Sequence, residues 1–160
     1  MTGAGGAEVV ARRIHPELVS LRRKLHAHPE LGLDLPLTQR AVLDALEGLD
    51  IEITLGEGLS SVVGVIRGRA PLPEGEQRPV VLLRGDMDAL PVVEEVDVPY
   101  AARNGLMHAC GHDLHVAALV GAAQILVESA DRLTSDVVLM FQPGEEGPGG
   151  AAPMIEEGLL

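Results

Sequence analysis

The chain has 160 residues and a mass of 16.8 kDa, and 46% of its residues are hydrophobic, which is enough for one domain with a buried core and excludes a disordered chain. Its formal net charge of -12 repels phosphate backbones and anionic lipids, so we expect neither nucleic acid nor a membrane as a partner. The single cysteine, Cys110, excludes a disulfide framework within the chain and fits a reducing compartment. Neither a signal peptide nor an apolar run of ~20 residues is visible, and we therefore expect a cytoplasmic protein.

The first half of the chain alternates between helical and extended patterns. Residues 1–13 are expected to be a flexible tail, and the leucines after Pro16 predict an amphipathic helix that ends near Pro29. Thr38 is the expected N-cap of a second helix, which stops at Gly48. Three strands are expected, at residues 51–54, 61–66 and 79–83. The last two are continuous β-branched runs, a pattern of strands that are buried on both faces.

The second half continues the alternation. A helix is expected over residues 115–128, a strand over 136–141 and a short helix over 152–157. This order predicts an α/β fold with a mixed, largely parallel sheet flanked by helices. Functional sites in such folds form at the carboxyl ends of strands.

Two aspartates follow the strand expected at residues 79–83. Asp86 and Asp88 are two residues apart and leave the strand on the same side, so one can face a cation while the other orients a ligand or water. The alternative is a turn in which both carboxylates bind their own backbone, and spacing alone favours this alternative.

A second polar loop precedes the helix at residues 115–128. A thiol at Cys110 and an imidazole at His112, separated by one glycine, can both bind a borderline-soft divalent ion. The nearby His108 and His115 favour a metal over a buried inert thiol or a cysteine nucleophile with a histidine base. For Asp113 we expect a helix cap rather than a hydrogen bond to a ligating imidazole.

A third polar loop follows the strand at residues 136–141. Its neighbouring carboxylates, Glu145 and Glu146, point in different directions, so one can bind a metal while the other takes a proton from water on that metal. The alternative is a solvated acidic turn. Glu-Glu pairs occur twice more in the chain, so the position at a strand end is what distinguishes this pair.

The three loops together resemble a known family, the amidohydrolase branch of the M20 metallopeptidases. The segments that carry the resemblance are LRGDMDALP at residues 83–91, MHACGHD at 107–113 and QPGEEG at 142–147, with LRRKLHAHPELG at 21–32 before them. The resemblance runs from about Ile14 to the end of the chain. It implies that residues 14–160 are the N-terminal part of a catalytic domain, and that a lid and dimerisation domain and two further metal-binding histidines lie beyond Leu160.

The resemblance also implies roles for individual residues. Cys110 is the ligand shared by two divalent ions, which are Zn, Mn, Co or Ni, and His112 and Glu146 are further ligands. Glu145 is the general base that deprotonates a metal-bound water, and Asp88 supports the catalytic centre. The implied reaction is hydrolysis of the amide bond of a small N-acyl amino acid or a related conjugate.

Other residues of the pattern have weaker assignments. Asp86 stands where other branches of the family have a histidine ligand, and His26 and His28 belong to the pattern without a metal role. Gly144 stands where the family usually has alanine, a small-for-small replacement that we expect to be harmless.

Two alternatives to this function stay open at the level of sequence. The chain is then either a truncated, non-catalytic remnant that folds or associates without turnover, or a hydrolase with a cysteine nucleophile. The oligomeric state is also open, and a homo-oligomer is compatible with everything above.

Overall fold

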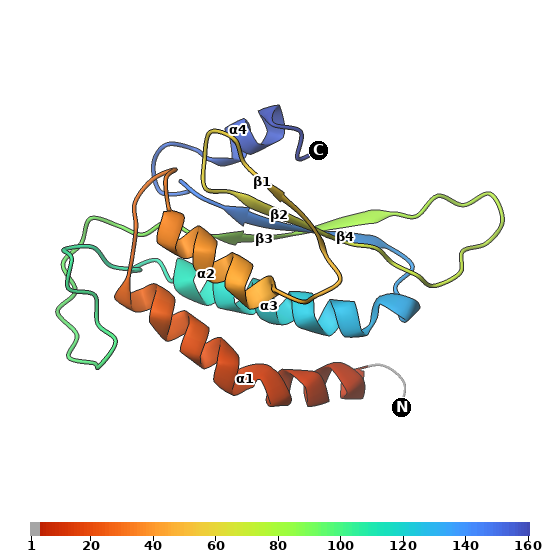
Figure 1. The fold of residues 1–160 in the computed structure, drawn as a ribbon, viewed down its shortest axis with the longest axis horizontal. Coiled ribbons are helices and arrows are strands. Elements are labelled where there is room, and N and C mark those ends of the chain that lie inside the picture. Colours follow the sequence, from red (N-terminus) through yellow and green to blue (C-terminus); the bar gives the residue numbers. More distant parts are fainter. Residues whose placement is uncertain (1–3) are drawn as a thin grey trace.

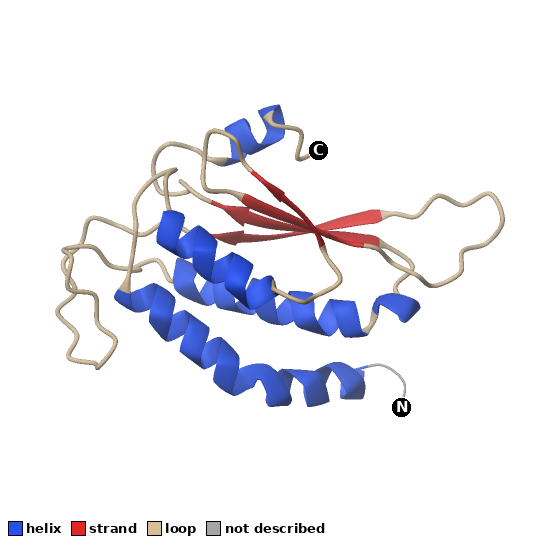
Figure 2. Cartoon of the chain, viewed as in Figure 1, coloured by secondary structure: helices blue, strands red, loops and turns tan. Residues whose placement is uncertain are grey.

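The computed structural model describes residues 4–160, in which four strands form one sheet between helices (Figure 1). In chain order the elements are α1 (Ala4–Ala27), α2 (Pro36–Leu46), β1 (Glu52–Leu55), β2 (Val62–Ile66), β3 (Val80–Asp86), α3 (His112–Glu128), the short 3-10 helix η1 (Ala130–Arg132), β4 (Asp136–Gln142) and α4 (Ala151–Glu156). Helices α2 and α3 lie along one face of the sheet, α1 packs outside α3, and α4 lies on the opposite side (Figure 2). None of the described helices is long and apolar enough to cross a membrane.

The sheet is mixed, as expected, with the strand order β1-β2-β4-β3. The expectation of a largely parallel sheet is wrong for the described strands, because β1–β2 and β2–β4 are antiparallel and only β3–β4 is parallel. The short loop of residues 56–61 between β1 and β2 cannot make the crossover that a parallel pair needs. Between β3 and β4, by contrast, α3 supplies that crossover.

Strand β3 differs from the expected doubly buried strand. Val80 and Val81 are 63% and 46% exposed, and Leu82 is exposed as well. The reason is position, because β3 pairs only with β4 and forms an edge of the described sheet. Strand β2 lies inside the sheet, and its residues are buried or half-buried. A β-branched run therefore predicted a strand correctly but did not predict its surroundings.

Helix α1 begins much earlier than expected. It starts at Ala4 and contains Pro16 in its interior, so most of the expected flexible tail of residues 1–13 is helical, while residues 1–3 lie outside the described residues. Ile14 is buried, and Leu18 packs against the core, so packing outweighs the hydrogen bond that Pro16 cannot donate. Helix α1 bends along its length (Figure 1), as is usual for a helix with an internal proline.

Helix α2 is capped by a residue from the preceding loop. The expected N-cap, Thr38, is wrong, because the helix begins at Pro36. The Glu30 carboxylate accepts hydrogen bonds from the backbone nitrogens of Leu37 and Thr38, at 3.1 and 2.8 Å. The Thr38 hydroxyl donates to the same carboxylate at 2.8 Å. Glu30 thus satisfies the free amides and fixes the loop between α1 and α2.

The core lies between the sheet and α2 and α3. Side chains of β2 and β4 alternate between the two faces, and Val62 and Leu139 point to the helices while Val63 and Met140 pack toward α4. Helix α3 is apolar around most of its circumference and contributes Val116 to this core. Burial of each such side chain stabilises the fold by about 1.5–3 kcal/mol. The packing fixes the N-terminus of α3 against the carboxyl ends of β3 and β4.

Candidate metal centre

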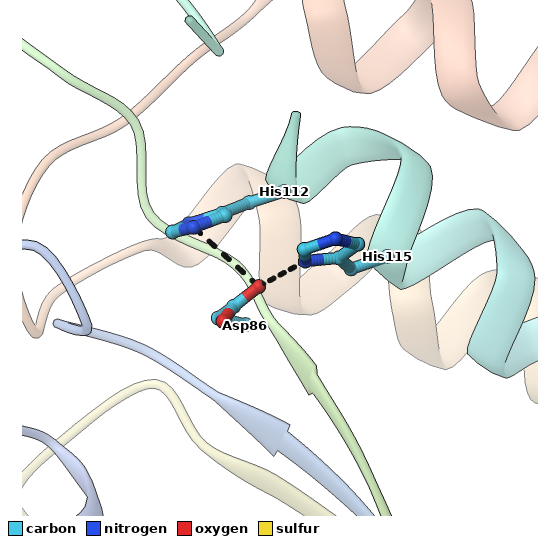
Figure 3. A group of neighbouring side chains, drawn as sticks. All are labelled: Asp86, His112 and His115. Carbon is cyan, nitrogen blue, oxygen red and sulfur yellow. Dashed lines mark hydrogen bonds and ion pairs between the residues drawn. The ribbon is translucent and has the colours of Figure 1, made fainter. Parts of the chain in front are cut away.

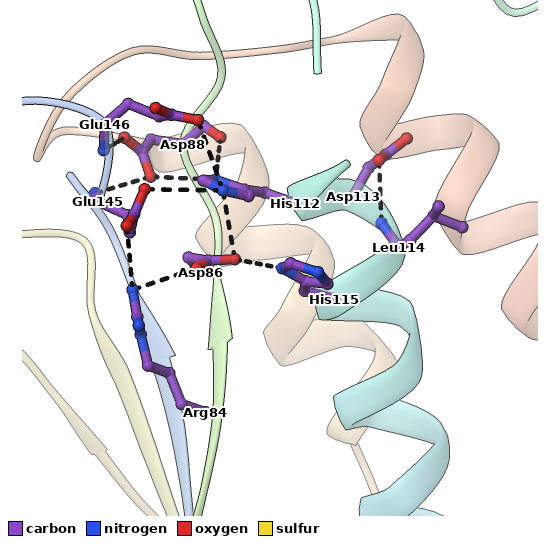
Figure 4. Close-up of polar contacts among 9 residues, drawn as sticks. All are labelled: Arg84, Asp86, Asp88, His112, Asp113, Leu114, His115, Glu145 and Glu146. Carbon is purple, nitrogen blue, oxygen red and sulfur yellow. Dashed lines mark hydrogen bonds and ion pairs between the residues drawn. The ribbon is translucent and has the colours of Figure 1, made fainter. Parts of the chain in front are cut away.

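The polar loops meet at one end of the sheet. Strands β3 and β4 are parallel neighbours, and Asp86 pairs with Gln142 at their carboxyl ends. The backbone nitrogen of Met87 donates to the Gln142 carbonyl at 2.8 Å, which keeps the two outgoing chains together. The first turn of α3 lies beside them (Figure 4). The sequence predicts these loops at strand ends, and the parallel pairing of β3 with β4 brings them into contact.

Asp88 joins the three loops from a buried position, being 1% exposed. Its two carboxylate oxygens accept hydrogen bonds from the backbone nitrogens of Glu145 and Glu146, each at 2.9 Å. Its backbone carbonyl accepts a hydrogen bond from Nδ1 of His112 at 2.8 Å. A carbonyl only accepts, so Nδ1 carries a proton, and in the neutral ring Nε2 has the free lone pair that a metal ion needs.

The three residues expected to bind metal lie together. The Sγ of Cys110, the Nε2 of His112 and a carboxylate oxygen of Glu146 are all within 4.8 Å of one another. A hydrogen bond with Glu146 raises the pKa of the Cys110 thiol above its ordinary value. One sulfur, one imidazole nitrogen and one carboxylate oxygen are a donor set that suits zinc and other borderline-soft ions.

A second group shares His112 with the first. Oδ1 of Asp86 accepts a hydrogen bond from Nδ1 of His115 at 2.6 Å and lies 3.5 Å from Nε2 of His112 (Figure 3). The rings of His112 and His115 stack, with centroids 5.6 Å apart. Arg84 Nη2 lies 3.1 Å from Oδ2 of Asp86. Nε2 of His112 has one lone pair and can bind one ion, so the two groups cannot both use it at once.

Glu145 lies on the open side of these groups. Its side chain is exposed, with Oε2 3.9 Å from Nε2 of His112 and Oε1 3.9 Å from Nη2 of Arg84. No hydrogen bond within the described residues holds the carboxylate itself, whereas its backbone is fixed by Asp88. The group is therefore placed beside the donor set and remains free to exchange a proton with a bound molecule.

Two glycines shape the turns that carry these side chains. Gly111 has a φ of +85° and is the N-cap of α3, which places Cys110 just outside the helix and His112 at its first position. Gly144 has a φ of +69°, and an added Cβ would lie 2.6 Å from a methyl of Leu33. This backbone conformation favours glycine, so the structure gives no sign that glycine is harmful here, whereas an alanine would be strained.

Two residues of the second loop do not have the expected roles. Asp113 is not the N-cap of α3, which is Gly111, although its Oδ1 accepts a hydrogen bond from the first-turn amide of Leu114 at 2.9 Å. His108 is buried away from both groups of donors, and neither ring nitrogen has a hydrogen-bond partner in the described part of the chain. Burial lowers the pKa of His108 to about 4 against the attraction of Asp113, so its ring is neutral near pH 7.

Local patterns do not predict the positions of Arg84 and His115 next to Asp86. Arg84 lies in the first motif without a signal of its own. For His115 the sequence predicts nearness to the other histidines but not its contact with Asp86. The spacing of residues 112 and 115 does contain one signal. They are about one helical turn apart, so both side chains lie on the same face of α3 and near the same strand end.

Comparison with known proteins agrees with this geometry. Residues 82–160 match the family model "Peptidase family M20/M25/M40". The chain is 45% identical over 153 residues to thermostable carboxypeptidase 1 of Saccharolobus solfataricus, covering 93% of this chain and 37% of that protein. It is 38% identical over 151 residues to the N-acetylcysteine deacetylase of Bacillus subtilis, covering 93% of this chain and 38% of that protein.

A solved structure gives the same result. The YXEP protein of Bacillus subtilis, a dinuclear metal binding peptidase from the M20 family, superposes with a TM-score of 0.84 at 38% identity, covering 93% of this chain and 41% of that one. The chain thus spans well under half the length of these relatives. Over that span the sequence and the fold agree, and the chain belongs to the M20/M25/M40 family of peptidases.

Proposed function

We propose that the protein hydrolyses the amide bond of small N-acyl amino acids or related conjugates with the help of divalent metal ions. The observation that carries the proposal is the convergence of Cys110, His112 and Glu146, with the free carboxylate of Glu145 beside them. The names of the relatives support the reaction class, because a carboxypeptidase and a deacetylase of an N-acyl amino acid both cleave a C–N amide bond.

Cys110, His112 and Glu146 are the proposed ligands, with Cys110 shared between two ions. The ions we propose are Zn, Mn, Co or Ni, since the donor set mixes sulfur, nitrogen and oxygen. A bound divalent ion would polarise the amide carbonyl and lower the pKa of water toward neutrality. The dinuclear site of the YXEP protein supports the proposed number of ions.

Glu145 is the proposed general base. Its carboxylate would take a proton from the water that attacks the carbonyl carbon, and would return that proton to the amine nitrogen as the C–N bond breaks. Exposure of the side chain and the 3.9 Å separation from Nε2 of His112 support this role. If both oxygens of the Glu145 carboxylate already accepted hydrogen bonds, the group would be a poor proton acceptor.

Asp88 has a positioning role in this proposal. Both of its carboxylate oxygens are used by the backbone amides of Glu145 and Glu146, so its carboxylate has no free oxygen directed at a substrate. Its carbonyl sets the orientation of the His112 ring. Asp88 therefore acts through the base and the two ligands that it holds.

A cysteine-nucleophile mechanism is disfavoured by the surroundings of Cys110. A nucleophilic cysteine needs a lowered pKa, usually from a nearby cation or a helix N-terminus. Here a hydrogen bond with Glu146, followed by desolvation and the charges of Glu146, Glu145 and Asp86, raises the pKa of the thiol. An acidic neighbourhood suits a cation ligand rather than a free thiolate.

The proposed activity concerns the complete protein, because this chain covers 37% of a relative such as thermostable carboxypeptidase 1. A chain of this length that binds metal without turnover is the second candidate, and the exposed edge of β3 offers it a surface for association. A cytoplasmic location and a homo-oligomeric state remain predictions.

Metal retention tests the proposal. The wild-type chain, Cys110→Ala and His112→Ala are dialysed against trace Zn²⁺ and Mn²⁺, and metal per chain is measured by elemental analysis. His28→Ala is the matched control, because the exposed His28 ring hydrogen-bonds to the Lys24 carbonyl and is in neither group of metal donors. We expect the wild type and the control to retain metal and both site variants to lose it. Equal retention in all four proteins would contradict the ligand assignment.

Turnover is measured on the same samples with N-acetyl amino acids, through the release of free amine. Hydrolysis that a chelator stops and added metal restores supports the enzymatic proposal. Hydrolysis that survives the chelator but not a thiol reagent would favour the cysteine nucleophile. Metal retention without amine release would assign the 160-residue chain to the non-catalytic candidate.

A further inference from the structure

We propose that His26 is a positioning residue for the metal centre, and that its ring ties the loop of residues 91–106 and the first turn of α3 to the end of α1. This inference rests on the proposed metal site at Cys110 and His112. No role in hydrolysis follows from the contacts that His26 makes itself, because it lies outside both groups of metal donors. The evidence for the inference is a buried group of charged side chains next to the proposed metal centre.

The His26 ring is 5% exposed and lies between two carboxylates. Its Nδ1 is 2.7 Å from Oδ2 of Asp113, and its Nε2 is 2.9 Å from Oε1 of Glu94. Glu94 and Asp113 are themselves buried and belong to segments that are distant in sequence. One side chain of α1 thus holds two segments that have no other common partner among the described hydrogen bonds.

The two contacts suit a ring that donates from both nitrogens. Ionised carboxylates only accept hydrogen bonds, so the imidazolium form of His26 satisfies Glu94 and Asp113 together. Arg22 Nη2 lies 3.1 Å from Nδ1 but is also a donor, so that contact is not a hydrogen bond to the protonated ring. Arg22 binds Asp113 instead, with Nε 2.8 Å from Oδ2. Two cations therefore balance the carboxylates of Glu94 and Asp113.

Glu94 transmits this contact to the loop. Its second oxygen, Oε2, accepts a hydrogen bond from the backbone nitrogen of Ala102 at 2.6 Å, which closes the loop on itself. Burial raises the pKa of the Glu94 carboxyl, but hydrogen bonds from His26 and Ala102 and the charges of His26 and Arg103 outweigh it, and the net pKa is lowered. The closed loop leads directly into Met107, whose backbone pairs with Leu90.

Asp113 transmits the contact to the ligand turn. It follows His112 in the first turn of α3, and its Oδ1 accepts a hydrogen bond from the backbone nitrogen of Leu114 at 2.9 Å (Figure 4). His112 is fixed on the other side by the Asp88 carbonyl. The turn that carries the proposed ligands is therefore held from two sides, by Asp88 toward the sheet and by His26 toward α1.

Removal of the His26 tether would weaken one of these two sides, where the ion pair of Arg22 with Asp113 would remain. The ligand atoms of Cys110 and His112 would then sample a wider range of separations, and an ion would have to order them on binding. Partners that orient metal ligands typically change metal affinity by about 10- to 100-fold. We expect the lower part of this range for His26, because the Asp88 contact to His112 remains.

The test compares His26→Gln with His28→Gln, the same substitution two residues away on an exposed ring. Glutamine keeps one donor group but has neither the charge nor the second donor. In the metal-free proteins, backbone amide exchange is measured at Ala102 and over residues 112–115. We expect faster exchange at both places in His26→Gln alone, with the amides of β2 and β4 unchanged.

Co²⁺ titration of the same proteins reports on the centre. We expect Co²⁺ affinity to fall about 10-fold in His26→Gln, with a shifted thiolate-to-cobalt absorption band, and no change in His28→Gln. Unchanged exchange and unchanged affinity in His26→Gln would overturn the inference. Faster exchange throughout the chain with an unshifted band would show a merely structural role and would also overturn it.

A second variant keeps the test decisive if His26→Gln does not fold. Glu94→Gln removes one carboxylate contact and keeps the shape of the side chain, and the exposed Glu95→Gln is its control. Faster exchange at Ala102 in Glu94→Gln supports the tether, and wild-type exchange there contradicts it. If the wild-type chain binds no Co²⁺, the proposed metal centre fails, while the exchange data still decide whether His26 holds the two segments.

Discussion

The backbone nitrogen of Glu145 donates a hydrogen bond of 2.9 Å to the carboxylate of Asp88, whose carbonyl in turn accepts from His112. The proposed base and a proposed ligand are therefore aligned by one buried residue. Asp88 comes from the end of β3 and Glu145 from the end of β4, so the relationship exists only because these two strands are parallel neighbours. The alignment of the centre is a direct consequence of the sheet topology.

Asp88→Asn tests this alignment. The variant replaces one acceptor oxygen by an NH₂ group, which cannot accept the hydrogen bond of the Glu145 or Glu146 amide. We expect a loss of about 1–3 kcal/mol in the free energy of unfolding and a 10- to 100-fold loss of metal affinity. Chemical denaturation and Zn²⁺ competition titration measure the two effects. Asp97→Asn, on an exposed loop residue, is the control, and equal behaviour of both variants would exclude the positioning role.

Glu145→Gln separates catalysis from metal binding. The amide cannot take a proton, so turnover of N-acetyl amino acids by the complete protein should fall by about 10²- to 10⁴-fold. Metal content should stay at the wild-type level, because Glu145 is not among the three proposed ligands. The exposed Glu156→Gln on α4 is the matched control. A variant that keeps its rate would exclude Glu145 as the base.

Gly144→Ala tests the backbone of the third loop. A φ of +69° costs an alanine about 1–2 kcal/mol, and the added Cβ must push aside a methyl of Leu33. We therefore expect the free energy of unfolding to fall by at least that amount in a denaturant titration. Gly147→Ala lies in the same loop, without a positive φ and with nothing within 4 Å of its Cβ, and should be close to neutral. Equal stabilities would show that the loop relaxes at no cost.

Local sequence patterns were sufficient for most of the elements and for two of the three candidate ligands, whereas the choice of Glu146 over Glu145 came from the family resemblance. The strand ends were predicted from apolar runs, and Cys110 and His112 from their spacing across one glycine. The errors arose where a distant partner decides the outcome. Pro16 indicated a helix start because the packing of α1 on α3 is not visible locally, and the contact of Asp113 Oδ2 with His26 was missed because the two residues are far apart in sequence.

Exposure was the second kind of information that the sequence lacked. The run at residues 79–83 has the composition of a buried strand, yet β3 is exposed because it has one neighbour in the described sheet. Strand order is set by the crossover through α3 and by the antiparallel insertion of β2 beside β4. Neither follows from the composition of the strand itself. Residue patterns therefore predicted the strand, and the topology of the sheet determined how exposed its side chains are.

The buried carboxylate of Glu94 predicts how stability depends on pH. Its pKa is lowered from the ordinary value of 4.5 by hydrogen bonds from His26 and Ala102 and by the charges of His26 and Arg103, against the opposing effect of burial. The unfolded chain then holds the proton more tightly than the folded chain. The stability that Glu94 contributes is therefore complete above pH 4.5 and is lost as the pH falls through the lower folded value.

Glu94→Gln removes this titration. We expect the variant to be less stable than the wild type at neutral pH, because a neutral amide no longer balances the His26 charge. We also expect its stability to fall less steeply with acid, since one proton-uptake step on unfolding is missing. Denaturant titrations at a series of pH values measure both slopes, with Glu95→Gln as the exposed control. Parallel slopes for Glu94→Gln and the wild type would show that Glu94 does not couple to folding, and would leave the acid sensitivity to the other buried carboxylates.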